Sequence, residues 1–143
     1  PDVIVYPTGG GEGIIGMWKA FAELRAAGWI AADAPTPRLV IAQAAGCAPL
    51  VRAFSSGAER ATAWEQPVTY AAGLRVPGPL GDRLVLKALR ETNGGAGSAD
   101  EATIREQTRR LANATGVDAA PEGGCALSVL EQLRQNGTIP ATA

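Results

Sequence analysis

The sequence has no histidine and very little lysine among its 143 residues. Without histidine, the protein cannot contain a Ser-His triad, a histidine general base or the usual zinc sites. Lys19 and Lys87 are its only lysines, and both fall in segments predicted to be amphipathic helices, where a long cationic side chain is usually solvated. Any chemistry of this chain must therefore depend on other groups.

Cysteine and net charge are equally scarce. Cys47 and Cys125 lie far apart and form no metal or redox motif, so we predict that both are small core residues in a protein of the reducing cytoplasm. The formal net charge is −1, which offers no basic field for nucleic acid. No apolar run approaches the roughly 20 residues that a membrane span needs. We expect neither nucleic acid nor a membrane as a partner.

The hydrophobic fraction of 46% is ample for the core of a single domain of this length. Apolar runs predict strands, and amphipathic spacing between turn residues predicts helices. A Ser98 to Glu101 capping box predicts the start of one helix, and Gly116 predicts its end. Residues 65–79 are irregular, with room for one short strand. Residues 93–97 are predicted to break the helix that precedes them. The expected strands are 2–6 and 38–43, and the expected helices are 17–25, 48–54, 80–90, 98–115 and 122–135.

Strand, helix and strand at this spacing predict a parallel βαβ unit. We expect an α/β fold, namely a partial three-layer structure with a parallel sheet and helices on both faces. The chain opens directly on a strand at Pro1 and offers fewer strands than a doubly wound sheet needs. Both features lead us to expect that part of the structure is supplied by another stretch of polypeptide.

The most informative motif is a glycine cluster between the first strand and the first helix. Backbone N–H groups of successive glycines can converge on one anion, and the positive end of the following helix adds to the attraction. A Walker A loop is excluded because the required lysine is missing, and a dinucleotide site is disfavoured because Gln43, not an acid, ends the second strand. The alternative is a glycine-rich turn without a ligand. The candidate phosphate-binding residues are Thr8, Gly9, Gly10, Gly11, Glu12 and Gly13.

Four blocks of the sequence, in order, closely resemble the threonine synthase family, which belongs to the fold-type II pyridoxal-phosphate enzymes. The resemblance covers nearly the whole chain and implies that residues 1–143 are the C-terminal part of the large cofactor-binding domain of such an enzyme. It is carried by Pro1-Asp2-Val3-Ile4-Val5-Tyr6-Pro7-Thr8-Gly9-Gly10-Gly11-Glu12-Gly13 and the following residues to Phe21, and by the blocks 43–54, 71–77 with 80–82, and 120–127.

The resemblance implies pyridoxal 5′-phosphate as the cofactor, with the glycine loop holding its phosphate. Glu12 would contribute only its backbone N–H, with its carboxylate directed away from the phosphate. Glu122 lies where relatives place the group that faces the pyridine nitrogen, although Pro121 and Glu122 could equally just start the last helix. Arg75 could bind the phosphate of the substrate, and an ordinary structural ion pair is the alternative.

The implied reaction is the conversion of O-phosphohomoserine and water to threonine and phosphate. In the family, the lysine that carries the cofactor as a Schiff base lies upstream of the glycine loop, and this chain has no counterpart. We therefore expect the chain to supply a phosphate-binding loop, to require the N-terminal part of the same enzyme, and to be inactive alone. A homodimer is compatible with this interpretation. The alternatives are a related threonine dehydratase or lyase and a non-catalytic module that binds a phosphate-bearing ligand.

Overall fold

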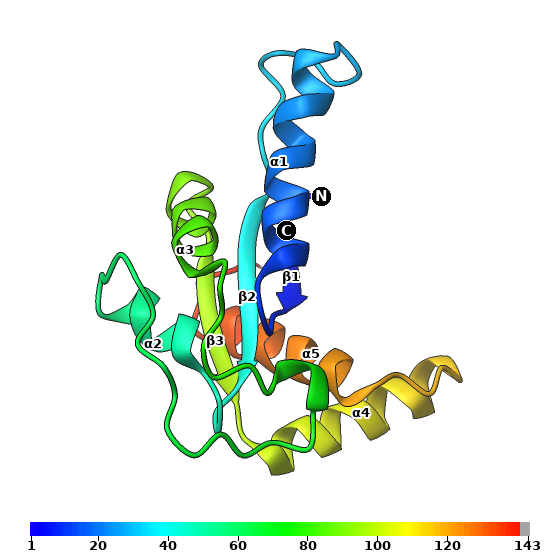
Figure 1. The fold of residues 1–143 in the computed structure, drawn as a ribbon. Coiled ribbons are helices and arrows are strands. Elements are labelled where there is room, and N and C mark those ends of the chain that lie inside the picture. The colour runs from blue at the N-terminus through cyan, green and yellow to red at the C-terminus, as the bar shows by residue number, and fades with distance from the viewer. Residues whose placement is uncertain (141–143) are drawn as a thin grey trace.

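A computed structural model of the chain describes residues 1–140. Its helices and strands alternate along the first half, and two long helices end it (Figure 1). The elements are β1 (Val3–Pro7), α1 (Glu12–Ala26), β2 (Arg38–Ala44), α2 (Pro49–Ser55), the 3-10 helix η1 (Ala72–Leu74), α3 (Asp82–Glu91), β3 (Gly95–Ala99), α4 (Glu101–Thr115) and α5 (Pro121–Gln135).

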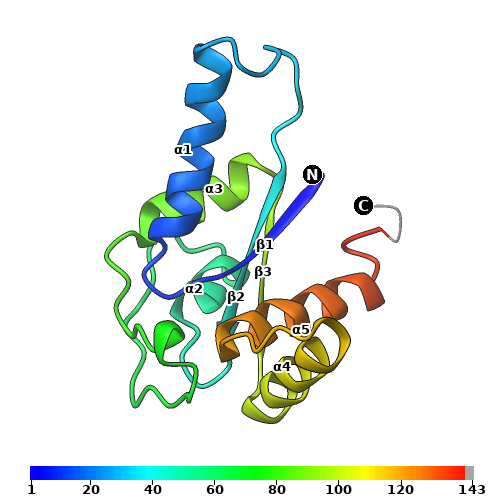
Figure 2. The same ribbon diagram turned by 90° about the vertical axis from the view of Figure 1, so that its right-hand side faces the viewer.

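The three strands form one parallel sheet in the order β1-β2-β3. Helices α4 and α5 cover one face, and α1, α2 and α3 cover the other (Figure 2). Each face has its own hydrophobic cluster, one packed around α5 and one between α1, α2 and α3. The prediction of a partial three-layer α/β structure is therefore confirmed.

Strand β2 lies at the centre of the sheet and is buried from Leu39 to Ala44. Its near-continuous apolar sequence is what a parallel strand needs when helices cover both of its faces. Odd and even residues of the strand point to opposite clusters: Val40 belongs to the cluster around α5, while Leu39 and Ile41 belong to the other. Burial on both sides fixes β2 as the axis around which the other elements are placed.

Helix α3 ends at Glu91, which confirms that residues 93–97 break the preceding helix, but the strand β3 that follows was not predicted. Gly95 to Ala99 pair in parallel with β2, so the glycines extend the sheet. Their small size is required there: a Cβ built at Gly94 would collide with the carbonyl oxygen of Leu39, and one at Gly97 would lie 2.7 Å from Cγ1 of Val129. Glycine here allows close approach of the backbone to its neighbours, an effect that local propensity does not report.

The start of α4 is two residues later than the capping box predicted. Ser98 lies in β3, and Asp100 is the N-cap residue, whose carboxylate accepts from the backbone N–H of Thr103 at 2.8 Å. Asp at this position is as good a cap as Ser, and the pairing of β3 with β2 decides between them. The helix ends at Gly116 with φ 74°, as predicted.

The remaining differences are at element boundaries. Helix α1 begins at Glu12 rather than at Met17, so the last part of the glycine motif is helical. The irregular segment 65–79 contains η1 and no strand. Among residues 1–140, no helix is both long and apolar enough to cross a membrane.

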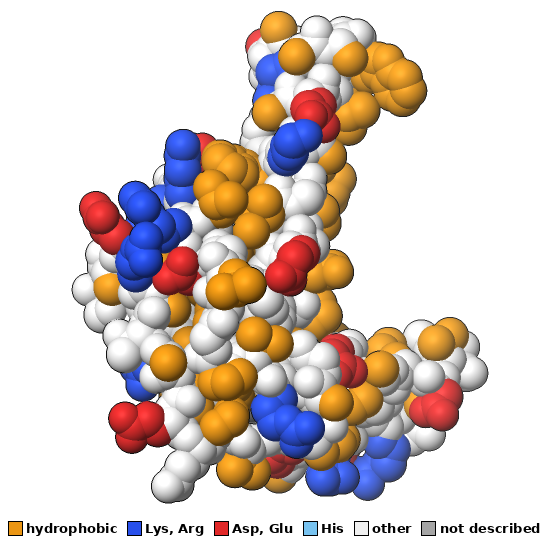
Figure 3. Space-filling model, in the orientation of Figure 1, with side chains coloured by type: hydrophobic (Ala, Val, Ile, Leu, Met, Phe, Trp, Pro, Cys, Tyr) orange, Lys and Arg blue, Asp and Glu red, His pale blue; other side chains and the backbone are white. Residues whose placement is uncertain are grey.

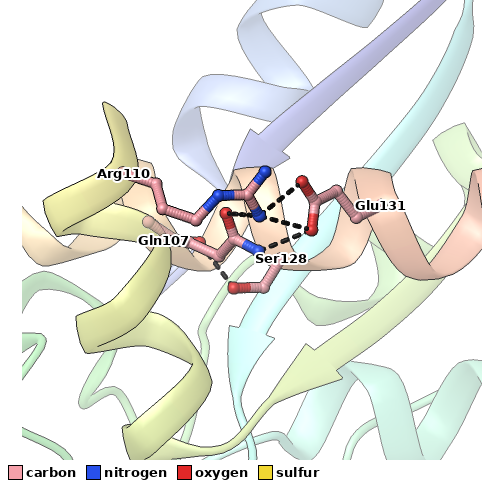
Figure 4. Close-up of polar contacts among 5 residues, drawn as sticks. Gln107, Arg110, Ser128 and Glu131 are labelled. Atoms are coloured by element: carbon pink, nitrogen blue, oxygen red, sulfur yellow. Dashed lines mark hydrogen bonds and ion pairs between the residues drawn. The ribbon is translucent and has the colours of Figure 1, made fainter. Parts of the chain in front are cut away.

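Helices α4 and α5 are joined by a polar cluster as well as by apolar packing (Figure 4). The side chain of Gln107, which is almost fully buried, donates to Oε2 of Glu131 at 2.5 Å. Arg110 donates to Oε1 of Glu131 at 2.9 Å and to Oε1 of Gln107 at 3.0 Å. Because these hydrogen bonds satisfy the polar side chains between the helices, they fix the register of α5 on α4.

Candidate functional site

The carboxyl ends of the three parallel strands meet at one edge of the sheet, where ligands of open α/β sheets usually bind. Strand β1 runs into the glycine loop, residues 8–13, and from there into α1. Strand β3 runs into α4, and the segment 65–79 passes alongside the same edge (Figures 1 and 2). The candidate residues predicted from the sequence are thereby brought to this edge.

Thr8 anchors the beginning of the glycine loop. Its side chain is 2% exposed, and its hydroxyl donates to the carbonyl oxygen of Tyr6 at 2.9 Å. Its backbone N–H donates to the carbonyl oxygen of Ala42 at 2.9 Å. The hydroxyl proton of Thr8 is thus directed to the backbone of β1, and the role that the structure supports for Thr8 is to fix the loop on the sheet.

The backbone N–H groups of Gly9, Gly10 and Gly11 have no hydrogen-bond acceptor within residues 1–140. Gly11, the N-cap residue of α1, has φ 104°, a left-handed conformation that favours glycine, and no side chain caps this helix. The start of α1 therefore presents unpaired donors at the positive end of the helix dipole. Such an arrangement binds anions, and above all phosphate.

The glycine loop is also closely packed. A Cβ built at Gly9 would collide with the carbonyl oxygen of Gly73, and one at Gly11 would collide with Cγ2 of Val85. A Cβ at Gly13, the second residue of α1, would lie 2.5 Å from Cε1 of Tyr6. Backbone at Gly73 and the fully buried Val85 side chain leave no space for a Cβ at Gly9 and Gly11, whereas at Gly13 the partly exposed Tyr6 ring would have to shift.

Glu12 does not point clear of the loop. A Cβ built at Gly10 would lie 2.5 Å from each carboxylate oxygen of Glu12, so the side chain folds back beside Gly10. The first turn of a helix favours an acid, which explains the position. In this arrangement the Glu12 carboxylate lies next to the donors that an incoming anion would use.

Glu122 and Arg75 come to the same region from different elements. Oε1 of Glu122, at the start of α5, accepts from the backbone N–H of Gly73 at 2.8 Å. Arg75 follows η1, is exposed, and has no ion-pair partner within residues 1–140. The structure thus brings Gly9, Gly73 and Glu122 into one chain of contacts, with Arg75 two residues further along.

Sequence reasoning missed the role of Gln43. This fully buried residue donates from Nε2 to the carbonyl oxygen of Thr8 at 3.1 Å. Its Oε1 accepts from the N–H groups of Leu50 and Val51 in the first turn of α2, at 2.9 and 3.1 Å. One side chain therefore links the glycine loop to α2. A polar residue at the end of an apolar strand was the signal that could have revealed it.

Neither cysteine is a nucleophile candidate. Both are fully buried, as predicted. Burial raises the pKa of the Cys47 thiol, against a smaller opposing effect of Arg75. Burial, together with the charges of Glu101 and Glu122, raises the pKa of Cys125 to about 12. Because the thiolate is the reactive form, burial and a raised pKa both disfavour a nucleophilic role for these cysteines. Within residues 1–140 no group of acids and cysteines is arranged to hold a metal ion.

The surface beside β1 is concave. Figure 3 shows the molecule hollowed between the projecting end of α1 and the projecting end of α4, with hydrophobic side chains along the α1 side. Strand β1 is an outer strand of the sheet, beside this hollow, and its residues are only partly buried or exposed. Large apolar side chains that remain exposed include Tyr6, Trp29 and Val117.

Comparison with known proteins gives a consistent result. The sequence pattern of the family described as pyridoxal-phosphate dependent enzyme matches residues 1–143. Threonine synthase from Methanosarcina acetivorans is 32% identical over 97% of this chain and 34% of its own length. Threonine synthase 2, chloroplastic, from Arabidopsis thaliana is 32% identical over 99% of the chain and 27% of its own length. The chain thus spans about a third of these curated relatives.

Solved structures share the fold. The crystal structure of a threonine deaminase from T.th. superposes with a TM-score of 0.73 at 24% identity, over 98% of this chain and 46% of that one. Maize serine racemase superposes with a TM-score of 0.69 at 18% identity, over 94% of this chain and 38% of that one. The three strands and their helices therefore correspond to part of a larger α/β unit in these proteins.

Proposed function

Since this chain belongs to the pyridoxal-phosphate dependent enzyme family, which matches its whole length, we propose that it is the phosphate-binding part of a threonine synthase-like enzyme. One observation carries the proposal: the N–H groups of Gly9, Gly10 and Gly11 are unpaired at the start of α1, within residues 1–140, in a loop that has no room for a Cβ at Gly9 or Gly11. The threonine synthases among the relatives favour this activity over others of the family.

The residues present fit the phosphate group of pyridoxal 5′-phosphate. A phosphate monoester is an acceptor with several oxygens, and the loop offers several unpaired donors with the positive end of a helix dipole behind them. The close packing of Gly9 against Gly73 and of Gly11 against Val85 holds these donors in place before any ligand arrives. Preorganisation of this kind lowers the entropic cost of binding.

When bound, the cofactor supplies an electron-withdrawing ring for chemistry on an amino-acid substrate. The residues of this chain would bind the phosphate of the cofactor and help to orient the substrate. The loop Gly9 to Gly13 holds the phosphate, Thr8 and Gln43 fix the loop on the sheet, and Arg75 offers an exposed guanidinium that can bind the phosphate of O-phosphohomoserine. The covalent attachment of the cofactor is left to the part of the enzyme outside this chain.

A second candidate is a threonine dehydratase or a related lyase. Its support is the fold of threonine deaminase, which superposes on 98% of this chain. Both candidates use the same glycine loop, and they differ in the substrate that the whole enzyme accepts. Turnover of O-phosphohomoserine and of threonine by the whole protein separates them: we expect phosphate release from the former, and faster deamination of the latter would select the second candidate.

The phosphate-binding role is tested by comparing two glycines of the same segment. Gly9→Ala places a Cβ where the carbonyl oxygen of Gly73 lies, whereas Gly16→Ala, within α1, places one where no other atom lies within 4 Å. We expect Gly9→Ala to weaken binding of pyridoxal 5′-phosphate and of inorganic phosphate about tenfold or more, since one or two charge-assisted hydrogen bonds are lost. Gly16→Ala leaves both affinities unchanged.

Isothermal titration calorimetry gives both affinities, with pyridoxal as the ligand that lacks a phosphate. We expect pyridoxal to bind much more weakly than pyridoxal 5′-phosphate, and Gly9→Ala to remove most of that difference. Equal affinity for the two ligands, or equal phosphate affinity of Gly9→Ala and Gly16→Ala, would contradict a phosphate-binding role of the glycine loop.

A further inference from the structure

The segment 65–79 has almost no regular structure, yet its centre is buried at the edge of the sheet. Ala71 and Leu74 belong to the hydrophobic cluster around α5. Only the 3-10 helix η1 lies within the segment. A stretch without ladder hydrogen bonds must be held by other groups if it is to keep one position.

The backbone N–H of Val68 donates to the carbonyl oxygen of Gly46 at 3.1 Å, and two carboxylates from the starts of two helices hold the centre of the segment. Oε2 of Glu101, the first residue of α4, accepts from the backbone N–H of Tyr70 at 3.2 Å. Oε1 of Glu122, the second residue of α5, accepts from the backbone N–H of Gly73 at 2.8 Å. The two N–H groups that they hold are three residues apart along the segment, and hydrogen bonds to a charged acceptor are stronger than neutral ones.

Gly73 connects this pair of acids to the glycine loop. While its N–H donates to Glu122, its carbonyl oxygen lies where a Cβ of Gly9 would be. A Cβ at Gly73 would in turn lie 3.0 Å from Oε1 of Glu122. Glu122, Gly73 and Gly9 therefore contact one another in series.

One of the two acids, Glu101, carries an energetic cost. Oε1 of Glu101 is buried and has no hydrogen-bond partner within residues 1–140. An unsatisfied buried carboxylate oxygen destabilises a fold. The negative charge of both glutamates also reaches Cys125 and raises its pKa. The first turn of a helix favours an acid, and each of these two acids in addition accepts from a backbone N–H of the segment.

We propose that Glu122 is a positioning residue, which holds Gly73 against Gly9 and so sets the shape of the anion-binding loop without touching the anion, while Glu101 holds the neighbouring Tyr70. The inference rests on the proposed function only for the identity of that anion. It assigns Glu122 a different role from that of facing the pyridine nitrogen, since the Glu122 oxygen is engaged by the backbone of the segment. The two roles make opposite predictions for a phosphate that carries no ring.

The test uses the purified protein with inorganic phosphate as the probe and with pyridoxal 5′-phosphate alongside. Glu122→Ala removes the acceptor of Gly73, whereas Glu122→Gln keeps an amide oxygen that can accept from the same N–H. We expect Glu122→Ala to weaken phosphate binding about tenfold and to shift the amide resonances of Gly9 and Gly10. Glu122→Gln restores both to within about twofold of the wild type, as rescue by a conservative variant requires.

Two further variants secure the interpretation. Glu106→Gln, on the exposed side of α4 where Glu106 pairs with Arg109, is the matched control and leaves every readout unchanged. Gly73→Ala keeps Glu122 but places a Cβ 3.0 Å from Oε1 of its carboxylate, which must shift, so we expect losses in the same readouts that are smaller than in Glu122→Ala. This variant decides the matter if Glu122→Ala does not fold.

Three results would overturn the positioning role: unchanged Gly9 and Gly10 resonances in Glu122→Ala, unchanged phosphate affinity in a folded Glu122→Ala, or a Glu122→Gln variant that weakens only the ring-bearing ligand. The last result would restore contact with the pyridine nitrogen. If the wild-type protein binds neither phosphate nor pyridoxal 5′-phosphate, the proposed function fails. The Gly9 and Gly10 resonances still decide whether Glu122 positions the loop.

Discussion

Helices α1 and α4 both begin where a parallel strand of the same sheet ends, and their first turns are completed in opposite ways. At α4, Asp100 accepts from the backbone N–H of Thr103 and from its hydroxyl, at 2.8 and 2.9 Å. At α1, the N-cap residue is Gly11, and no side chain caps the helix. The donors at the start of α4 are used by the protein itself, and those at the start of α1 are left open.

The comparison separates a structural helix start from one that can bind a ligand. A helix loses stability when its first N–H groups have no acceptor, so an uncapped start is a cost unless something else pairs with it. In α1 this cost is combined with glycines that have no space for a Cβ. An external anion would explain both the uncapped N–H groups and the closely packed glycines. The capped start of α4 shows that this chain can cap a helix where no ligand is needed.

The largest effect should come from filling the open start. Gly11→Ala introduces a Cβ that collides with Cγ2 of Val85, at a residue with φ 104°. We expect a loss of about 3 kcal/mol in the free energy of unfolding, from left-handed strain plus overpacking, and a loss of phosphate binding. Urea denaturation and calorimetric titration measure the two effects.

Gly28→Ala is the matched control for Gly11→Ala. Gly28 has φ 73°, and no atom lies within 4 Å of a Cβ built there. It should cost only the left-handed strain, about 1 kcal/mol, without a change in phosphate affinity. Equal destabilisation by the two variants would mean that the contact with Val85 relaxes freely and that the loop is not closely packed.

Only one side of the contrast between the two helix starts could be predicted from the sequence. The glycine cluster after an apolar strand predicted the open start of α1 because strand, turn and helix signals are local. The cap of α4 was misplaced to Ser98 because β3 was not recognised: its small residues pair only because β2 supplies a fully buried neighbour. The contact of Glu122 with Gly73, 49 residues away, depends on tertiary packing that no local pattern reports.

An intermediate effect on phosphate affinity should follow from removing the charge of Glu12, which lies beside the unpaired N–H groups. The Glu12 carboxylate folds back beside Gly10, where it repels an incoming phosphate. We expect Glu12→Gln to tighten phosphate binding about two- to fivefold, since a charge near a helix terminus is worth a few tenths to one kcal/mol. Raising the salt concentration should shrink the gain.

Glu23→Gln provides the control for Glu12→Gln. Glu23 lies near the other end of α1 and pairs with Lys19 on the exposed surface. Its neutralisation changes the net charge by the same amount, so a matching gain in phosphate affinity would show that overall charge, and not the position of Glu12, is responsible. No gain in Glu12→Gln would mean that the carboxylate moves aside without cost.

The smallest effect should be found at the capped start. The two hydrogen bonds from Thr103 hold the pKa of Asp100 below its ordinary value of 3.8. Its carboxylate therefore contributes stability that is fully present above pH 3.8 and is lost as the pH falls through that value toward the lower pKa of the folded state. Asp100→Asn, which keeps a capping oxygen but cannot ionise, should lack this dependence. Thermal unfolding of both proteins between neutral pH and pH 3 measures this dependence. We expect the wild type to be slightly more stable than the variant at neutral pH and to lose that difference as the pH falls. Phosphate affinity at neutral pH should be the same in both proteins. A drop in phosphate affinity in Asp100→Asn would mean that the start of α4 also affects anion binding, and that its role is not purely structural.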